Sequence, residues 1–567
     1  MTTKIGREHA CKLHTLDPWE KTIMEFVKPP APYMCEKNGY AMFYVNETGY
    51  LCLRSSMNEY YRMTSPVCVY HVVHFGEDDS TVELGERVVF NPPVFVKGLV
   101  FKVLCHLPEN SQSIIYSLIH FNYAWDVPMS KTVEREDEET YSVIFFGIDS
   151  LSRSQAIRQL PRSYQYFLKE LNGFDFKGYM KVGFNTYPNL VPLLTGRPHS
   201  DFRSKDMFYR YMDDLPYIWN ERKLKNYVTF YAEDRQDIAT FNYLHRGFKS
   251  PPTDYYYRLA GLAMLQYPAI INLSQTNTSQ TGCYGNRDLF SIQLEFLKKF
   301  ITKFEGKRKF AFFWNNELTH DDFNGVQNGD EPIHDFFTWL KTNGHTRHSI
   351  VIFASDHGFR IGGASETYTG RLENNMPLLM IHVPDVLLQK HCDLKQAMTY
   401  NTDKLLSAYD IHETIMAVIN KRFEGEESKH KLIKHIGSHH VQRSLFSKLP
   451  KLRTCTDAGI PDQFCTCDDV TLVSINNPLI LPLAERVVMH INKLLHDVTH
   501  LCRPLMLLNI SEARVNHHAV GDQDHNPIYR HPGLLQRLKG ATSDESGRYW
   551  SFNVEDQILI TFQSNSI

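Results

Sequence analysis

The sequence predicts an α/β fold in which a mostly parallel sheet is covered by helices on both faces, with smaller N- and C-terminal flanking domains. Short, uniformly apolar segments such as Val143–Phe146 and Ile350–Ala354 are typical of strands buried on both faces. They alternate along the chain with longer segments of helical spacing, a rhythm that produces parallel sheets. At 567 residues the chain exceeds a single typical core, so we expect one large unit with appended domains.

The expected α/β core covers residues 140–450. Its segments are strand 143–148, helix 153–171, a helix from Pro188 to Gly196, strand 228–231, helix 289–304, strand 310–313, helix 333–342, strands 349–354 and 378–382, and helix 409–419. Residues 1–135 are expected to form a loop-rich, partly β domain with cysteines, with strands at 41–45, 67–75, 87–90 and 94–104. Residues 451–567 form a cysteine-containing C-terminal region, with an amphipathic helix at 482–498 and strand character in 549–562.

Composition excludes some classes of function. The net charge is −3 and no long basic stretch occurs, so we expect no nucleic-acid partner. The longest apolar runs fall short of the roughly 20 residues of a transmembrane helix, so no such segment is expected in this chain. The first 25 residues lack the apolar block of a secretory signal, which taken literally indicates the cytoplasm.

The cysteines point to another compartment. Five of the 11 precede residue 106 and four follow residue 454, so the flanking regions are richer in cysteine than the core. This pattern is typical of disulfide-bonded domains, and we expect an extracellular or secretory-pathway protein whose signal or anchor is absent from this sequence. The N-x-S/T sequons of a glycoprotein occur at Asn46, Asn272, Asn277 and Asn509, about as many as chance gives.

Polar side chains follow three of the expected strands. Asp149 ends the first strand, where open α/β sheets bind ligands, although an aspartate there can also be a turn or capping residue. Asp356 and His357 follow another fully apolar strand and offer a carboxylate and an imidazole to one metal ion. Glu317 and His320 follow a third strand, in a segment polar enough to be an ordinary loop.

Thr186 is the candidate nucleophile. It precedes Pro188, which suits the first turn of a helix, so the hydroxyl is expected near free backbone N–H groups that favour an anion. Beside a carboxylate-bound cation this hydroxyl could become an alkoxide. The alternative is a threonine cap, which stabilises a helix by about 1 kcal/mol and has no catalytic role.

These motifs resemble, in the same order, the metal and nucleophile motifs of the alkaline phosphatase superfamily. They are Ile148-Asp149-Ser150, Asn185-Thr186-Tyr187-Pro188-Asn189 with Leu194-Thr195-Gly196-Arg197, and Ser355-Asp356-His357-Gly358. More closely, the chain resembles the animal family catalogued as domain of unknown function 229, placed beside the sulfatases. That resemblance extends through 231–234, 252–255, 409–414, 444–446 and 453–460.

The resemblance distinguishes between relatives at position 186. Sulfatases carry C-x-P-x-R there, and their cysteine becomes a formylglycine; this chain has Thr186 and, in place of the arginine, Leu190. Threonine cannot form that aldehyde, so the chain is sulfatase-like by fold but not by chemistry. Thr186 is similar to the nucleophile of nucleotide pyrophosphatase/phosphodiesterases and of phosphoethanolamine and lipoteichoic-acid transferases. Asn189 is similar to the asparagine of the TFPN pattern in the first group, which implies a catalytic role.

The resemblance implies a metal-dependent phosphoester hydrolase or phosphotransferase. Asp149, Thr186, Asp356 and His357 would hold one divalent ion, Zn or Mn. His320, with Glu317, would bind a second metal or protonate the leaving oxygen, although Glu317 precedes His320 by three residues where two-metal relatives have an aspartate four before. A later histidine ligand has candidates at 412, 435, 439 and 440. The expected substrate is a phosphorylated small molecule, a lipid headgroup or a glycan. The alternative is a catalytically inactive extracellular binding or adhesion protein on the same fold.

Overall fold

The computed structural model describes residues 11–35, 41–129, 131–137, 139–202, 209–271, 274–276, 282–423, 442–467, 470–496, 504–510, 513–516, 549–553 and 558–563. The chain divides into two compact units. The larger comprises residues 15–465, so the N-terminal β segment and the α/β core belong to one unit. The smaller comprises residues 1–14 together with 466–567.

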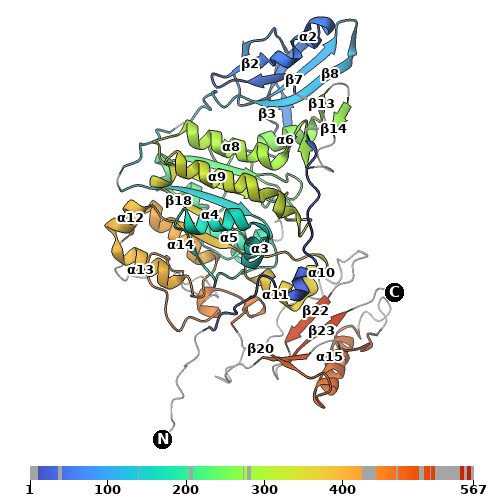
Figure 1. Ribbon diagram of the computed structural model, residues 1–567, viewed down its shortest axis with the longest axis vertical. Helices are drawn as coiled ribbons and strands as arrows, with labels where there is room; N and C mark the ends of the chain where they lie inside the picture. The colour runs from blue at the N-terminus through green and yellow to red at the C-terminus, as the bar shows by residue number, and fades with distance from the viewer. Residues whose placement is uncertain are drawn as a thin grey trace. The chain divides into compact units, whose positions relative to one another are not determined.

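A seven-stranded sheet forms the centre of the larger unit, in the order β10-β19-β18-β9-β17-β11-β12 (Figure 1). Its strands are β9 (Ser142–Ile148), β10 (Phe174–Asp175), β11 (Val228–Glu233), β12 (Tyr255–Tyr256), β17 (Lys309–Asn315), β18 (Ser349–Ala354) and β19 (Leu379–His382). The strands from β18 to β12 pair in parallel, and β19 and β10 are antiparallel at one edge. The mostly parallel sheet predicted from the sequence is confirmed.

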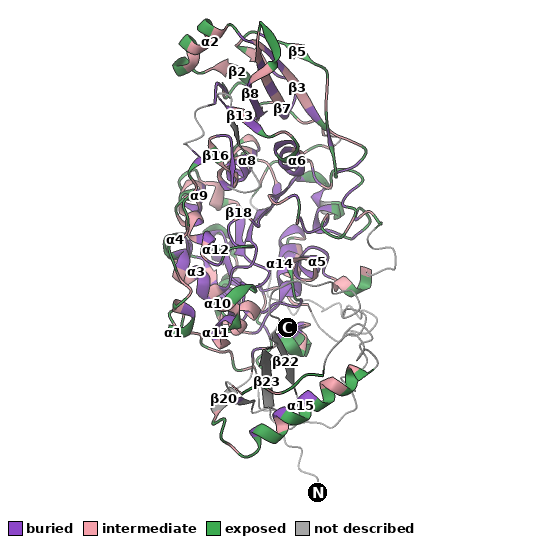
Figure 2. Ribbon diagram, turned by 90° about the vertical axis from the view of Figure 1, so that its right-hand side faces the viewer, coloured by how far each residue is buried: buried purple, intermediate pink, exposed green. Residues whose placement is uncertain are grey.

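Helices cover both faces of this sheet. The helices described in residues 140–450 are α3 (Arg153–Gln159), α4 (Pro161–Lys169), α5 (Thr186–Thr195), α6 (Arg258–Gln266), α8 (Leu289–Lys303), α9 (Asp330–Thr342), α10 (Gly362–Glu366), α11 (Tyr368–Asn375), α12 (Asp385–Lys390), α13 (Cys392–Asn401) and α14 (Ala408–Ile419). In Figure 2, β18 lies between α4 and α9 on one side and α5 and α14 on the other. The α/β class with helices on both faces is therefore confirmed.

The continuous helix expected over 153–171 is wrong, because the chain breaks it into α3 and α4 at Leu160. Pro161 has no N–H to donate to the preceding turn, and its ring disfavours helical geometry at the residue before it. Leu160 accordingly has φ −122° and ψ 48°. The helix expected to start at Pro188 begins two residues earlier, at Thr186, and ends as predicted at Gly196 in left-handed geometry with φ 67°.

Aromatic side chains fill both faces of the central strands. Phe146 stacks on Phe313 with ring centroids 4.7 Å apart and on Phe336 of α9 at 5.2 Å. On the opposite face, Phe145 stacks on Phe312 at 4.9 Å. On the face of Phe145, Gly147 admits no side chain, since a Cβ there would lie 2.1 Å from the ring of Trp314. This packing fixes the strand that carries Asp149.

The N-terminal segment is β-rich. A second sheet has the order β14-β13-β8-β7-β3-β4, with β5 paired to β3. Its strands are β3 (Val67–Phe75), β4 (Val82–Leu84), β5 (Val88–Val89), β7 (Val100–Leu107), β8 (Asn110–Phe121), β13 (Ala269–Ile271) and β14 (Ser274–Thr276). A small sheet contains β1 (Phe43–Val45), β2 (Tyr50–Leu53) and β6 (Val94–Phe95), and two short helices are α1 (Lys21–Met24) and α2 (Asn58–Thr64). The strand expected at 94–104 is therefore two strands, and β8 was not predicted.

The smaller unit contains α15 (Ile480–Leu494) and a sheet in the order β20-β21-β23-β22. Those strands are β20 (Val470–Val473), β21 (Ala513–Asn516), β22 (Tyr549–Asn553) and β23 (Ile558–Gln563). The predicted amphipathic helix is confirmed as α15, although residues 497–498 lie outside the described residues. None of the described helices has the length and apolar character needed to cross a membrane.

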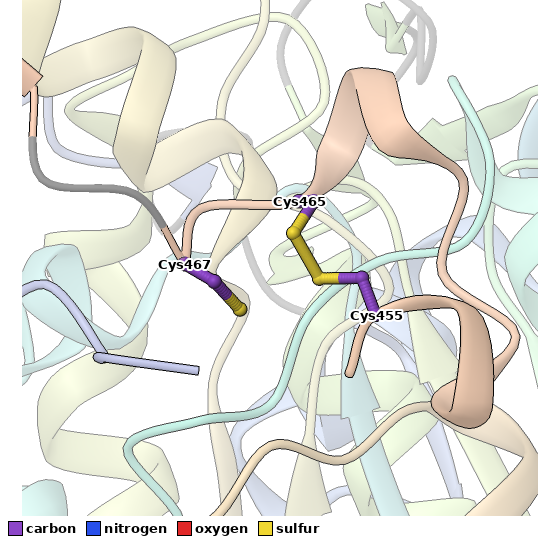
Figure 3. A group of neighbouring side chains, drawn as sticks. All are labelled: Cys455, Cys465 and Cys467. Atoms are coloured by element: carbon purple, nitrogen blue, oxygen red, sulfur yellow. A yellow bond between two sulfur atoms is a disulfide. The ribbon is translucent and has the colours of Figure 1, made fainter. Parts of the chain in front are cut away.

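Four disulfides join cysteines of the described residues: Cys11–Cys467, Cys35–Cys283, Cys68–Cys105 and Cys455–Cys465. The predicted use of cysteine in disulfides is thus confirmed. Figure 3 shows the bond between Cys455 and Cys465 together with Cys467, whose own sulfur is bonded to Cys11. Because all three thiols are oxidised, these cysteines offer no thiolate to a metal ion. Cys502 lies outside the described residues.

Candidate metal centre

Asp149, Asp356 and His357 lie together at one edge of the central sheet. Asp149 directly follows β9, and Asp356 comes two residues after the end of the neighbouring parallel strand β18. The carboxyl ends of parallel strands meet at one sheet edge, so these two strands bring the three side chains together. Their potential ligand atoms all lie within 4.8 Å of one another, and all three residues are buried.

Asp149 is fixed through its backbone and both carboxylate oxygens. Its N–H donates to the carbonyl of Asn315 at 2.8 Å, and its own carbonyl accepts from the hydroxyl of Thr319. Oδ2 accepts from Ser150 Oγ at 3.0 Å, and Oδ1 accepts from Thr186 Oγ at 3.0 Å. The carboxylate therefore faces the candidate nucleophile directly.

Asp356 and His357 each present one buried atom without a protein partner. Asp356 Oδ1 accepts from the N–H groups of Ser150 at 3.2 Å and His357 at 2.9 Å, but its Oδ2 has no hydrogen bond. His357 Nδ1 lies 2.9 Å from the carbonyl of Gly358, which assigns the proton to Nδ1 and leaves Nε2 with a free lone pair. Nε2 lies 3.3 Å from Asp356 Oδ2, so the two orphaned atoms face each other.

The electrostatics of this cluster suit the binding of a cation. Burial lowers the pKa of His357 to about 3, so the imidazole is neutral, as a metal ligand must be. Burial, together with the charge of Asp356, raises the pKa of Asp149 to about 6. Burial also raises the pKa of Asp356. Two buried carboxylates and an imidazole lone pair form a donor set that suits a divalent metal such as Zn or Mn.

Thr186 occupies the first position of α5 beside this cluster. The preceding residue, Asn185, makes no side-chain capping bond to the helix, so the first-turn N–H groups are not capped by it. Thr186 is half-buried, whereas Asp149 is fully buried. The apolar residues of α5 that follow, including Leu190 and Leu194, are buried and anchor the helix. The hydroxyl is thus held against Asp149 by a residue that is itself only partly buried.

Asn189 is engaged entirely by backbone groups. Its Oδ1 accepts from the N–H groups of Val182 at 2.7 Å and Gly183 at 2.9 Å, and its Nδ2 donates to the carbonyls of Gly183 at 3.0 Å and Asn185 at 2.9 Å. These bonds use the full hydrogen-bonding capacity of the amide, and the side chain is buried. Asn189 therefore holds the loop that leads to Thr186, and the catalytic role expected from the resemblance stays a prediction.

Glu317 and His320 are not part of the cluster formed by the described residues. The carboxylate of Glu317 lies 3.8 Å from Arg235, and burial together with Asp234 raises its pKa to about 7. His320 Nδ1 contacts Asp321 Oδ1 at 2.6 Å in the same loop. Among the residues that the structure describes, no second group of possible ligands forms around Glu317 and His320, and their metal-binding role stays a prediction.

Of the candidates for a later histidine ligand, only His412 lies among the described residues. His412 packs against the end of α5, where its Nδ1 lies 3.0 Å from the carbonyl of Leu193, and burial lowers its pKa to about 4. It stands outside the group of possible ligands found among the described residues. His435, His439 and His440 lie outside the described residues.

The sequence analysis assigned no role to two residues that support the candidate site. Asp234 directly follows β11, and its carboxylate accepts from Asn315 Nδ2 and from the N–H groups of Asn316 and Glu317, so it shapes the loop after β17. Its position at a strand end was the available signal. Lys181 is buried beside the loop that carries His357, and nothing in its sequence neighbourhood distinguishes it from a surface lysine.

Parts of the chain are similar to three solved structures. They are the C-terminal periplasmic domain of EptC from Escherichia coli in complex with Zn, the lipoteichoic acid synthase LtaP from Listeria monocytogenes and the putative sulfatase yidJ from Bacteroides fragilis. EptC is 11% identical, with 52% of this chain and 86% of that chain covered and a TM-score of 0.32. LtaP is 11% identical, with 60% of this chain and 81% of that chain covered and a TM-score of 0.33. The putative sulfatase is 14% identical, with 50% of this chain and 75% of that chain covered and a TM-score of 0.34. Likeness at this level carries no conclusion about function.

No curated protein matches the sequence. The profile of one family, described as protein of unknown function (DUF229), matches residues 54–511. This range is most of the chain and includes every residue of the metal-ligand cluster and Thr186. The resemblance drawn from the motifs is therefore confirmed, and the chain belongs to the DUF229 family.

Proposed function

We propose that this protein is a metal-dependent phosphoester hydrolase or phosphotransferase that uses Thr186 as its nucleophile. One observation carries the proposal: the Thr186 hydroxyl donates at 3.0 Å to Asp149, within a buried cluster whose Asp356 Oδ2 and His357 Nε2 lack partners. Buried polar atoms are normally satisfied, so two that face each other beside the half-buried Thr186 support the proposal that an ion binds here.

Asp149, Asp356 and His357 would hold one divalent ion, Zn or Mn, with Thr186 Oγ beside it. When bound, such an ion lowers the pKa of a nearby hydroxyl and offsets negative charge on a phosphoryl group. The protein supplies the remaining parts. Asp149 orients the hydroxyl, and the N–H groups in the first turn of α5 favour a phosphoryl anion at this position.

The reaction would proceed in two displacements. Thr186 Oγ forms a bond to phosphorus while the bond from phosphorus to the leaving alcohol breaks, and the hydroxyl proton is taken up near Asp149. Water or an acceptor alcohol then breaks the threonine ester, which gives hydrolysis or transfer. His320 is the candidate acid that protonates the leaving oxygen, because its loop follows β17 at the same sheet edge.

Phosphoryl chemistry is favoured over sulfuryl chemistry because the residue at the nucleophile position is a threonine. A sulfatase needs an aldehyde there, and a secondary alcohol cannot be oxidised to one. The candidate substrates are accordingly phosphorylated small molecules, lipid headgroups or glycans. We also infer from the four disulfides that the protein folds in an oxidising, secretory or extracellular compartment.

The test compares the purified protein with Thr186→Ala and Thr186→Ser. The wild type should retain about one equivalent of Zn or Mn and cleave a nitrophenyl phosphodiester. Thr186→Ala should lose cleavage, Thr186→Ser should keep part of it, and mass spectrometry of quenched wild type should find phosphate on Thr186. A matched control is Thr399→Ala, which removes an exposed threonine of α13.

The rival function, a binding or adhesion protein without turnover, makes the opposite prediction. It would retain metal but cleave neither monoesters nor diesters, and Thr186→Ala would change nothing that is measured. That result would refute the enzymatic proposal.

A further inference from the structure

Lys181 is a buried cation beside the candidate metal centre. It lies five residues before Thr186, and its side chain is 3% exposed. The two residues after it, Val182 and Gly183, are held by the amide of Asn189, so the backbone that carries Lys181 is fixed. A lysine held under such constraint has a defined place for its ammonium group.

The ammonium group has few partners for a buried charge. It donates to Asn374 Oδ1 at 2.7 Å and lies 4.9 Å from the centre of the Phe464 ring. Among the described residues, no carboxylate oxygen lies within the 4.0 Å of an ion pair. An ammonium has three N–H donors, and buried charges are normally paired, so one neutral amide leaves this cation under-satisfied. Burial accordingly lowers the pKa of Lys181 to about 7.

The same contacts place Lys181 against the loop of His357. Asn374, which accepts from the ammonium, also accepts through its carbonyl from the N–H of Gly358 at 3.0 Å. The backbone N–H of Lys181 donates to the carbonyl of Asn375 at 3.1 Å. Among charged neighbours, Asp356 acts on Lys181 most strongly. The ammonium is thus bracketed by the loop that precedes Thr186 and the loop that carries Asp356 and His357.

We propose that the Lys181 ammonium binds a non-bridging oxygen of a tetrahedral oxyanion, phosphate or sulfate, when that group sits over Thr186. The inference rests on the proposed function and names the group that recognises the substrate's charge. A negative oxygen supplies what the buried cation lacks, since bonds between ionised partners are about twice as strong as neutral ones.

The test measures binding of inorganic phosphate and, separately, inorganic sulfate to the metal-loaded protein by titration calorimetry. In Lys181→Met, which keeps most of the length of the side chain and removes the charge, the Kd for phosphate should rise by about 10- to 100-fold. Metal content should stay at the wild-type value. The matched control is Lys177→Met, which removes an exposed lysine four residues away that pairs with Asp403, and its Kd should not change.

A second variant guards against misfolding of the first. Asn374→Asp is isosteric and gives the ammonium a permanent carboxylate partner, so it should also raise the Kd for phosphate by about tenfold or more. The anion that binds the wild type more tightly, phosphate or sulfate, identifies the group that this site recognises. The affinity for that anion should fall in both Lys181→Met and Asn374→Asp.

A purely structural lysine would give a different result. Lys181→Met would then shift the melting temperature in phosphate-free buffer and leave the Kd unchanged, and that outcome overturns the proposal. A wild type that binds neither anion overturns it too. The proposed function fails independently: if Thr186→Ala hydrolyses diesters like the wild type while Lys181→Met loses phosphate, the anion site stands and the nucleophile assignment falls.

Discussion

Asp356→Asn should weaken metal binding and, at neutral pH, stabilise the metal-free protein. The substitution removes one charge of two buried carboxylates while keeping an oxygen that can accept from the N–H groups of Ser150 and His357. A cluster built to hold a cation is destabilised without it, because like charges are left together in a buried place. If Asp356 had only a structural role, its substitution would not both weaken metal binding and stabilise the metal-free protein.

The magnitude follows from the pKa of Asp149. Burial, with the charge of Asp356, raises this pKa from 3.8 to about 6 in the folded protein. At about 1.36 kcal/mol per pKa unit, the difference disfavours the folded state by about 3 kcal/mol at neutral pH. Between about pH 4 and pH 6 the folded state holds the proton of Asp149 more tightly than the unfolded chain, so the contribution of Asp149 to the stability of the metal-free protein falls as pH rises through this range.

The substitution removes the contribution of Asp356 but not that of burial. At pH 7 the metal-free Asp356→Asn variant should therefore be more stable than metal-free wild type by about 1 kcal/mol, and by less than the full ~3 kcal/mol. At pH 4, where Asp149 is protonated, the two should converge. Added Zn or Mn should stabilise the wild type and have little effect on the variant, because a ligand stabilises only the state that binds it.

The assay is urea unfolding of chelator-treated protein at pH 4 and pH 7, with metal content measured by mass spectrometry after reloading. Asp403→Asn, an exposed carboxylate that pairs with Lys177, is the control and should resemble the wild type in every measurement. If Asp356→Asn keeps wild-type metal content, or if its metal-free form is less stable than the metal-free wild type at pH 7, the reasoning about the cluster is refuted.

Three other predictions concern residues that support the site. Asn189→Ala should destabilise the protein by about 2–4 kcal/mol in urea unfolding and lower kcat more than KM, because buried backbone groups lose their partners. Asn189→Asp, which keeps the accepted bonds, should lose less free energy of unfolding. Equal losses in the two variants would contradict this account. Asp410→Ala should lower the free energy of unfolding by about 3–5 kcal/mol in thermal unfolding, because it removes the carboxylate paired bidentately with buried Arg453. The double variant with Arg453→Met should recover part of that loss, and no recovery would contradict the role of the pair. Gly147→Ala should cost about 3 kcal/mol or more, since its Cβ would lie 2.1 Å from the Trp314 ring, and a soluble variant with unchanged melting temperature would exclude that clash.

The order of strands and helices in the core was largely readable from the sequence. Apolar runs predicted β9, β17 and β18 within one or two residues, because a strand buried on both faces must be apolar at every position. The prediction failed where local geometry overrode periodicity. Pro161 divides one predicted helix, and β8 was not predicted from its largely polar beginning at 110–113.

The sequence by itself determined which residue types stand at the strand ends: Asp149 after one buried strand, and Asp356 and His357 after another. Parallel pairing of two such strands makes their ends neighbours, so that juxtaposition follows from local pattern and topology. Only the tertiary structure decided where loop side chains point. It directs Glu317 toward Arg235, uses all of Asn189 on backbone groups and buries Lys181 against Asn374. The reason is that a loop has no repeating backbone geometry, so the direction of its side chains depends on contacts with residues far away in the sequence.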